Sequence, residues 1–214
     1  KQSFMTFNEL AGYEKEKGRK PLVLVAFALE EESISVELPR CNVIRTIIGV
    51  GKANAAMNLT AAVLELHPDL IINVGTAGTI NHAVGDILVC RRFVDRNLYN
   101  LRIHGLIADI DALPCPLFES GSVVGGRRTI GEYTVNTGDN FATDKDGLFG
   151  DAIDMEAFAC AAVCLKFGLP FVSVKYVTDI VGQNSVKQWS DKLSDARMAL
   201  HQFFVDYNEK KDQR

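Results

Sequence analysis

Long apolar runs, clustered basic residues and paired cysteines are all scarce in this chain of 214 residues. No uninterrupted apolar stretch approaches the roughly 18 residues that a membrane-spanning helix needs, and the segment 1–20 is too polar for a signal peptide. The net charge of −4 leaves no dense stripe of lysine and arginine for a nucleic-acid backbone. We therefore expect no membrane and no nucleic acid as partner, and we predict a cytoplasmic protein.

The five cysteines are an odd number without a C-x-x-C spacing, which favours free thiols over a disulfide framework. Cys160 and Cys164 lie four residues apart in a predicted helix. Because their neighbours are mostly alanine and no histidine is near, core packing is favoured over a metal site. We expect neither a metal nor a cofactor.

The apolar residues, 47% of the chain, suffice for the core of one domain. The run 22–28 is continuously apolar, as in a strand that is covered on both faces. Short β-branched runs then alternate with helical spacing over 52–66, 156–167 and 187–208, which predicts an α/β fold with a mixed, largely parallel sheet. We assign 1–20 to an extension of helical composition and 21–214 to the domain, with loops over the site between 95 and 150.

Carboxylates stand where the predicted strands end. Glu156 follows one apolar run and opens a helix, Glu30-Glu31-Glu32 follows the first strand, and Asp179 closes the run 171–177. Such strand ends meet in one crevice of an α/β sheet. Acids that converge there without a cation partner are typical of acid/base chemistry. Ordinary roles as first-turn or turn carboxylates stay open for each of them.

Two glycine-rich turns also follow predicted strands. Gly49-Val50-Gly51-Lys52-Ala53-Asn54 fits neither the dinucleotide nor the P-loop fingerprint, because Asn54 replaces the third glycine and no serine or threonine follows Lys52. Close packing of helix on strand is the favoured interpretation. Asn73-Val74-Gly75-Thr76-Ala77-Gly78 is either an ordinary turn or a place where backbone and the Thr76 hydroxyl meet a sugar or anion.

Taken in order, these motifs resemble the nucleoside phosphorylase-I superfamily, and most closely its hydrolytic branch, the 5′-methylthioadenosine/S-adenosylhomocysteine nucleosidases. The resemblance covers about 22–207 and is weakest over 95–150, where those nucleosidases usually have a longer helix and a lid contributed partly by a neighbouring subunit. It implies a single-domain, three-layer α/β/α fold and a homodimer. The matching segments are Ala28-Leu29-Glu30-Glu31-Glu32 (A-M-E-E-E), Gly49-Val50-Gly51-Lys52 (G-I-G-K), Asn73-Val74-Gly75-Thr76-Ala77-Gly78 (N-T-G-S-A-G), Asp154-Met155-Glu156-Ala157 (E-M-E-A) and Thr178-Asp179 (S-D).

The resemblance also implies roles for individual residues. Glu32 would activate the attacking water, Asp179 would hydrogen-bond the purine and protonate N7, and Glu156 would hold the ribose hydroxyls. These residue types suit a reaction that passes through an oxocarbenium-like sugar, because the leaving purine must be neutralised and the ribose held by an anion. The other implied substrate contacts are Met155 against the nucleoside, Phe141 stacked on the base, Ala142, Thr76 beside the sugar, Ala77, Gly78, and Trp189 near the 5′ substituent.

The implied activity is that of an enzyme, a nucleosidase that hydrolyses the N-glycosidic bond of a small purine nucleoside and releases the base and (thio)ribose. A phosphate-dependent purine nucleoside phosphorylase is one alternative. Hydrolysis is favoured because phosphorylases present an arginine just before the glycine turn, where this chain has Asn73-Val74, and because Glu32 would repel phosphate. Arg91 and Arg92 stay open as anion ligands.

Two further alternatives are a different nucleoside substrate and a protein without catalytic activity. Lys175 stands where an arginine is expected beside the sugar, so a futalosine- or inosine-type nucleoside hydrolase is possible. An acidic residue at Asp179 suits a purine N7 but does not choose between adenine and hypoxanthine. A nucleoside-binding protein without activity is the third alternative.

Overall fold

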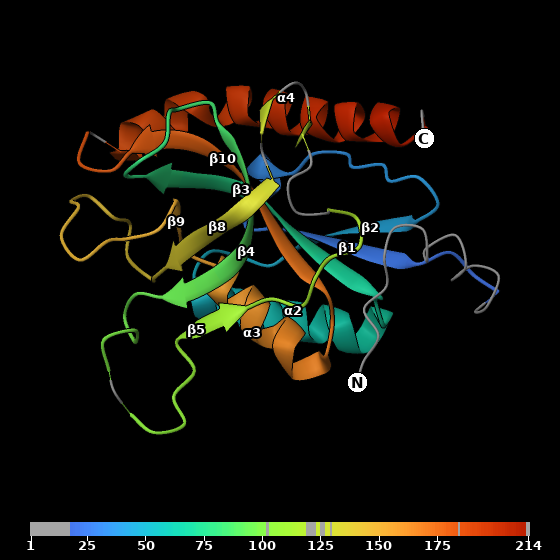
Figure 1. Ribbon diagram of the computed structural model, residues 1–214, viewed down its shortest axis with the longest axis horizontal. Coiled ribbons are helices and arrows are strands. Elements are labelled where there is room, and N and C mark those ends of the chain that lie inside the picture. The colour runs from blue at the N-terminus through green and yellow to red at the C-terminus, as the bar shows by residue number, and fades with distance from the viewer. Residues whose placement is uncertain are drawn as a thin grey trace.

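The computed structural model describes residues 18–101, 103–118, 123–124, 127–128, 130–183 and 185–212, so that most of the predicted extension 1–20 lies outside the described residues. Strands and helices alternate along much of the chain, as predicted (Figure 1). The strands are β1 (Leu22–Phe27), β2 (Asn42–Ile47), β3 (Leu70–Thr79), β4 (Ile87–Asp95), β5 (Asp109–Asp111), β6 (Val123–Val124), β7 (Arg127–Arg128), β8 (Ile130–Thr137), β9 (Ala152–Asp154) and β10 (Phe171–Ile180); the helices are the 3₁₀ turn η1 (Glu30–Glu32), α2 (Lys52–Leu66), α3 (Ala157–Phe167) and α4 (Ser185–Asp212).

Eight of the strands form one mixed sheet in the order β10-β4-β8-β9-β3-β1-β2, with β5 paired to β4. The prediction of a mixed sheet is confirmed, because β1–β2, β1–β3, β3–β10, β4–β8 and β8–β9 are parallel while β4–β10, β3–β9 and β4–β5 are antiparallel. Since β10 also pairs with β3, the strands β3, β10, β4, β8 and β9 close into a ring. The expected three-layer arrangement therefore describes the molecule only in part, since the sheet is barrel-like rather than a flat middle layer.

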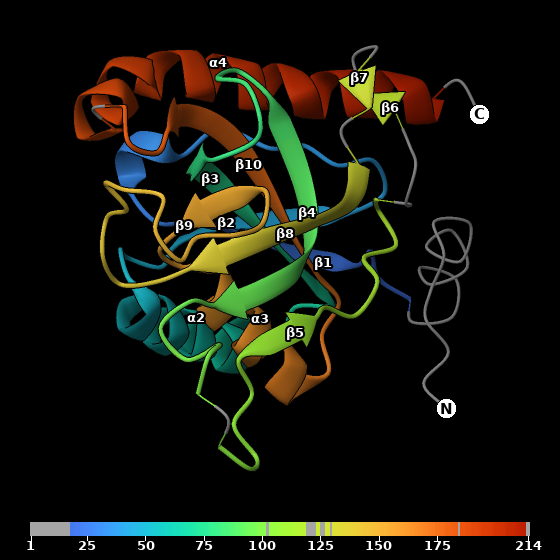
Figure 2. The same ribbon diagram turned by 60° about the vertical axis from the view of Figure 1, so that its left-hand side comes forward.

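Helices nonetheless cover both sides of the sheet. Figures 1 and 2 both show α4 on one side and α2 with α3 on the other. Along β1 alternate side chains supply the two sides: Val23, Val25 and Phe27 pack with α4, whereas Leu24 and Ala26 pack with α2 and α3. The continuous apolar run of β1 thus has the physical cause expected of a strand covered on both faces.

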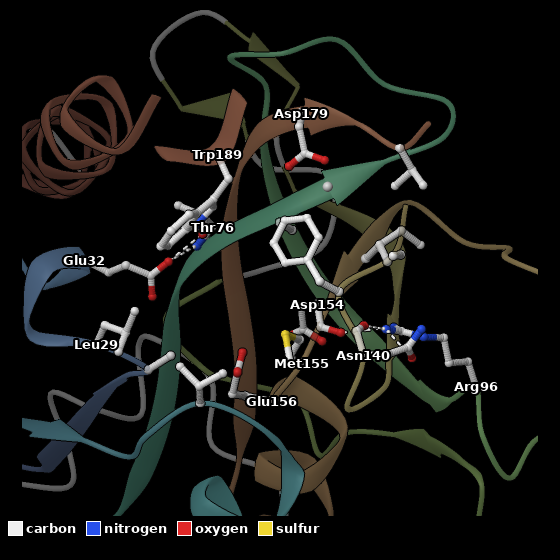
Figure 3. Close-up of a pocket in the computed structure, with 18 residues that line it drawn as sticks. Leu29, Glu32, Thr76, Arg96, Asn140, Asp154, Met155, Glu156, Asp179 and Trp189 are labelled. Atoms are coloured by element: carbon white, nitrogen blue, oxygen red, sulfur yellow. Dashed lines mark hydrogen bonds between the residues drawn. The ribbon is translucent and has the colours of Figure 1, made fainter. Parts of the chain in front are cut away.

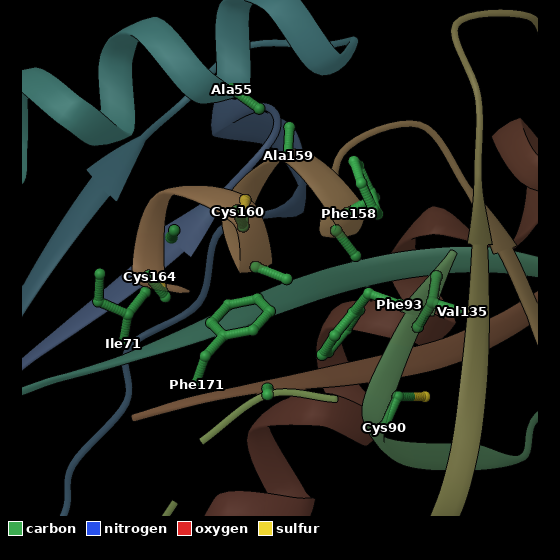
Figure 4. Close-up of a cluster of buried hydrophobic side chains, with 14 of the residues drawn as sticks. Ala55, Ile71, Cys90, Phe93, Val135, Phe158, Ala159, Cys160, Cys164 and Phe171 are labelled. Atoms are coloured by element: carbon green, nitrogen blue, oxygen red, sulfur yellow. The ribbon is translucent and has the colours of Figure 1, made fainter. Parts of the chain in front are cut away.

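Cys160 and Cys164 of α3 are buried in the second of these clusters, close to Ile71 and Phe171 (Figure 4). All five cysteines are free thiols. Burial raises the pKa of the Cys160 and Cys164 thiols well above the ordinary value, as expected for core residues. The prediction that this pair packs in the core is confirmed.

The strands that matter for function end together. β1 and β10 both run parallel to β3, so their carboxyl ends lie at one edge of the sheet. The short strand β9 reaches the same edge beside β3, where Ile153 pairs with Gly78. The edge where these strands end is therefore the natural place for a site.

Among the described residues, the helices are too short or too polar to cross a membrane.

Candidate active site

A pocket of about 230 Å³ opens at this edge, lined by the ends of β3, β9 and β10, by η1 and by α4 (Figure 3). Every residue that the sequence predicts for catalysis or substrate binding lines it. The lining also includes Arg96, Asn140 and Asp154, for which the sequence predicts no role in the site. The predicted residues are Glu32, Thr76, Ala77, Gly78, Phe141, Ala142, Met155, Glu156, Asp179 and Trp189.

Glu32 is the buried member of the three consecutive glutamates, with 6% of its surface exposed. Its Oε1 accepts hydrogen bonds from the Thr76 hydroxyl at 2.5 Å and from the Thr76 backbone N–H at 3.3 Å. Burial raises the pKa of the Glu32 carboxyl, while the hydrogen bonds from Thr76 and the charge of Lys175 oppose that rise. A buried carboxylate with an increased proton affinity is suited to act as a general base.

Asp179 reaches the pocket through an irregularity near the end of β10. The pairing of β10 with β3 shifts register between Val177 and Asp179, and such a shift re-aims the side chain that follows it. Asp179 is 2% exposed and accepts a hydrogen bond from the Thr178 hydroxyl at 2.8 Å. A Cβ on Gly78 would lie only 3.0 Å from Asp179 Oδ2, so glycine at this position lets the carboxyl group lie close to β3.

Glu156 stands at the N-terminus of α3 and accepts a hydrogen bond from the backbone N–H of Gly51 at 2.9 Å. Burial, followed by the negative charge of Asp154, raises the pKa of Glu156 to about 7. Gly51 has φ of +87°, a conformation that favours glycine. Gly49 of the same turn packs closely on α2, because a Cβ added to it would lie 3.0 Å from the Asn54 Cβ. The turn therefore serves the packing predicted for it and also holds Glu156.

A buried ion pair between Lys175 and Asp154 lies close to these carboxylates. Lys175 Nζ is 2.9 Å from Asp154 Oδ2, with side chains that are 2% and 1% exposed. Burial lowers the pKa of Lys175, but the charges of Asp154 and Glu156 outweigh it and leave the pKa raised, so Lys175 is a cation. The expectation of acids without a cation partner is therefore wrong. The lysine was visible in the sequence, but its burial among the acids depends on the pairing of β10.

Asp154 is held by more than this lysine. Its carboxylate also accepts hydrogen bonds from the Thr137 hydroxyl at 2.6 Å and from the Ala157 backbone N–H at 2.9 Å. A buried ion pair is stable only when additional hydrogen bonds satisfy its polar atoms. Since Met155 and Glu156 follow Asp154 directly, this network fixes the segment that carries two of the predicted substrate contacts.

The loop of residues 138–142, here called the base loop, carries Phe141 into the pocket. Arg96 ties this loop to β9: its guanidinium donates to the carbonyls of Asn136 at 3.0 Å, Asp154 at 3.1 Å and Gly138 at 3.2 Å, and also to Asn140 O (Figure 3). A Cβ on Gly138 would collide with the Arg96 guanidinium, so the loop needs glycine there. Sequence reasoning missed Arg96, because it lies in the stretch of weakest resemblance and in no motif.

Lys52, which pairs with the neighbouring Asp95, anchors the loop from another direction. Lys52 Nζ pairs with Asp95 at 2.8 Å, and the Lys52 backbone N–H donates to Asp139 Oδ1 at 2.7 Å. The start of α2, the end of β4 and the base loop are therefore held together. Phe141 itself remains 38% exposed.

Trp189 of α4 meets the opposite side of the pocket from the base loop. Its indole Nε1–H donates a hydrogen bond to the Thr76 hydroxyl at 2.9 Å.

Arg91 and Arg92 do not line the pocket; they lie with Asp109 in a separate hollow, and Arg92 forms a two-point contact with that aspartate. Among the described lining residues Arg96 is the only basic one, and its guanidinium is engaged by backbone carbonyls.

Comparisons with known proteins show the family to which this chain belongs. The family model described as the Phosphorylase superfamily matches residues 29–120 and 118–207. The 5′-methylthioadenosine/S-adenosylhomocysteine nucleosidase of Bacillus pumilus is 33% identical over 172 residues, covering 72% of this chain and 74% of that protein. The nucleosidase of the same name from a Marinomonas species is 29% identical over 164 residues, covering 68% and 71%.

Solved structures share the fold. The apo 5′-methylthioadenosine nucleosidase of Arabidopsis thaliana superposes with a TM-score of 0.74 at 18% identity, covering 92% of this chain and 98% of that one. A futalosine hydrolase mutant of Helicobacter pylori superposes with a TM-score of 0.71 at 15% identity, covering 89% and 99%. These likenesses extend over nearly the whole of both known structures.

Proposed function

Because this chain belongs to the phosphorylase superfamily, we propose that it is a nucleosidase that hydrolyses the N-glycosidic bond of a purine nucleoside. The substrate we propose is of the 5′-methylthioadenosine/S-adenosylhomocysteine type, after relatives such as the Bacillus pumilus enzyme. The observation that carries this function is the convergence of Glu32, Glu156 and Asp179, all nearly buried, on one pocket. Carboxylates are held in this way where acid/base chemistry needs them.

In the proposed reaction, Glu32 takes a proton from water as the water oxygen bonds to C1′ of the sugar. The C1′–N9 bond breaks, its electron pair leaves with the purine, and protonated Asp179 delivers a proton to N7. Glu156 accepts hydrogen bonds from the ribose hydroxyls, so its negative charge faces the cationic sugar of the transition state. Water is thereby added across the bond, and the purine base and the sugar are released.

Hydrolysis is preferred to phosphorolysis on electrostatic grounds. A phosphate would have to lie close to Glu32, and two negative groups brought together in a buried site repel strongly. The arginines that the sequence leaves open as anion ligands, Arg91 and Arg92, line a different hollow. The basic side chain at the pocket, Arg96, binds backbone carbonyls. Water is therefore the proposed nucleophile.

The pocket suggests how a nucleoside would lie. Phe141 offers an aromatic face for the purine beside Asp179, while Met155 and Glu156 offer the sugar side. Trp189 and Leu29 border the end where a 5′ substituent would emerge. Aromatic stacking against Phe141 would add affinity without choosing between purines, so the choice of base depends on polar contacts.

We also propose a homodimer and a cytoplasmic location. Exposed apolar side chains on α2 support the dimer, because Met57 and Leu64 lie seven residues apart on the helix and are 63% and 57% exposed. The five free thiols are in keeping with a reducing compartment. Met57→Lys should shift the sedimentation coefficient to that of a monomer, whereas the control Met198→Lys, at an equally exposed methionine of α4, should not; a Met57→Lys protein that sediments like the wild type would contradict this interface.

Base release measured by chromatography tests the function. The substrates are methylthioadenosine, S-adenosylhomocysteine, adenosine, inosine and futalosine, each with and without phosphate. We expect adenine from the first two at a rate that does not depend on phosphate. Release only with phosphate would identify a phosphorylase. Release from inosine or futalosine alone would identify a nucleoside hydrolase of that type. Nucleoside-induced thermal stabilisation without any release would identify a binding protein.

A further inference from the structure

The single tryptophan of the chain, Trp189, makes a polar contact with the catalytic side of the pocket. Its indole Nε1–H donates to Thr76 Oγ1 at 2.9 Å, and the same hydroxyl donates to Glu32 Oε1 at 2.5 Å. In Figure 3 the indole from α4, the hydroxyl from β3 and the carboxylate from η1 form one chain of hydrogen bonds. An aromatic residue used only for packing against a substrate would not need this arrangement.

The direction of these hydrogen bonds follows from the chemistry of the groups. The indole N–H is a donor only, whereas a threonine hydroxyl has one proton and two lone pairs. When Trp189 donates to Thr76, one lone pair of the hydroxyl is used and its proton must point to a different acceptor. Glu32 Oε1 is that acceptor. The indole thereby removes the rotational freedom of the hydroxyl proton and assigns it to Glu32.

We propose, on the premise that Glu32 activates the water as set out above, that Trp189 is a positioning residue whose indole N–H fixes the Thr76 hydroxyl as a donor to Glu32. The hydroxyl and the backbone N–H of Thr76 both engage Oε1, so the remaining oxygen of Glu32, Oε2, is the one presented to water. Phenylalanine at this position would fill much of the same space but could not donate.

The expected consequence is an effect on the acid/base behaviour of Glu32. Burial raises the pKa of this carboxyl, and the side-chain hydrogen bond from Thr76 is the largest contribution in the opposite direction. A hydrogen bond to the charged form favours that form. If the Thr76 proton is no longer directed at Glu32, the pKa of Glu32 rises further and less of the enzyme carries the base at a given pH.

Trp189→Phe tests this in the kinetics. Loss of one hydrogen bond in the chain should lower kcat for adenine release roughly three- to tenfold and move the acidic limb of the pH profile to higher pH, with a smaller change in KM. In a Thr76→Val background, which already lacks the hydroxyl, the same substitution should have no further effect on kcat or on the pH profile. A Trp189→Phe enzyme with the wild-type kcat and pH profile would overturn the proposal.

A second readout does not depend on turnover. Because the chain has one tryptophan, a ¹⁵N–¹H spectrum contains a single indole cross-peak, which belongs to Trp189. We expect this peak to move with pH as Glu32 titrates, and the movement to disappear in both Glu32→Gln and Thr76→Val. A peak that is insensitive to pH, or that still titrates in Glu32→Gln, would contradict the coupling.

The two readouts separate failure of this inference from failure of the proposed function. A wild-type protein that releases no base from any nucleoside would remove the nucleosidase assignment, while the indole titration would still decide whether Trp189 acts on Glu32 through Thr76. If the wild type is active, but its indole peak does not follow the titration of Glu32 and the pH profile does not change in Trp189→Phe, the nucleosidase assignment stands. Trp189 would then serve only in packing.

Discussion

The two sides of the pocket are built in different ways. The carboxylate side consists of residues at the ends of β3, β9 and β10 and in η1, where Glu32, Glu156 and Asp179 are nearly buried. The base side is the loop of residues 138–142, which holds the partly exposed Phe141 and depends on the side chains of Arg96 and Lys52 for its attachment. Groups that move protons need fixed geometry, whereas a stacking contact tolerates a loop.

This contrast suggests a division of roles. Substitutions on the carboxylate side should reduce turnover or the stability of the fold, because the groups there have the roles proposed for them in the reaction or belong to a buried charge network. Substitutions that loosen the base loop should weaken the binding of substrate more than its conversion.

Glu32→Gln should lower kcat roughly 10²- to 10⁴-fold, the usual contribution of positioned proton transfer, without lowering the melting temperature. The matched control is Glu31→Gln, since Glu31 is the exposed neighbour in the same turn. Kinetics of adenine release and thermal denaturation of both variants check this. Near-normal turnover by Glu32→Gln would remove Glu32 from the mechanism.

Lys175→Met should destabilise the protein by about 3–5 kcal/mol, because it leaves the Asp154 carboxylate buried without its cation. Lys192→Met, which breaks the exposed pair with Asp195, should leave the free energy of unfolding almost unchanged. Urea unfolding followed by circular dichroism measures both. Equal midpoints for the two variants would mean that the buried pair contributes no more than a surface pair.

The pH dependence of substrate affinity should report Glu156. Burial and the charge of Asp154 raise its pKa to about 7, so the carboxylate form, which we propose accepts hydrogen bonds from ribose, is present above that pH and lost below it. KM should therefore rise as pH falls below about 7, by up to about tenfold per unit. Glu156→Gln should flatten this dependence; a KM profile that keeps its shape in the variant would assign the titration to another group.

Arg96→Ala should raise KM several-fold and change kcat less. The rise in KM would reach about tenfold if about 1.4 kcal/mol of substrate-binding free energy is lost. The reason is that the base loop loses the donor that holds its carbonyls at Gly138 and Asn140. Arg92→Ala is the control, because Arg92 pairs with Asp109 outside the pocket. A fall in kcat as large as that of Glu32→Gln, with KM unchanged, would contradict the division of roles.

The sequence predicts the carboxylate side well, for a physical reason. Strand ends in an α/β fold share an edge, so the cluster Glu30-Glu31-Glu32, Glu156 and Asp179 could be expected near one another from the order of apolar runs, while the choice of Glu32 came from the resemblance. The predicted contacts Phe141 and Trp189 also line the pocket, but they came from the resemblance and from no pattern of their own.

Other features depend on pairings that no local pattern encodes. The ring closure requires β10 to pair with both β3 and β4, and the same pairing buries Lys175 beside Asp154. Arg96 acts through backbone carbonyls of a loop more than 40 positions away, and backbone acceptors leave no signature in a sequence. The hydrogen bond from Trp189 to Thr76 joins residues 113 positions apart.

A crystal structure of Glu32→Gln with intact methylthioadenosine would test the assignment of the pocket most directly. We expect the purine against Phe141 with N7 within hydrogen-bond distance of Asp179, the ribose hydroxyls on Glu156, and the 5′ group toward Trp189. A nucleoside bound with N7 away from Asp179, or with its ribose away from Glu156, would contradict the roles given to both carboxylates.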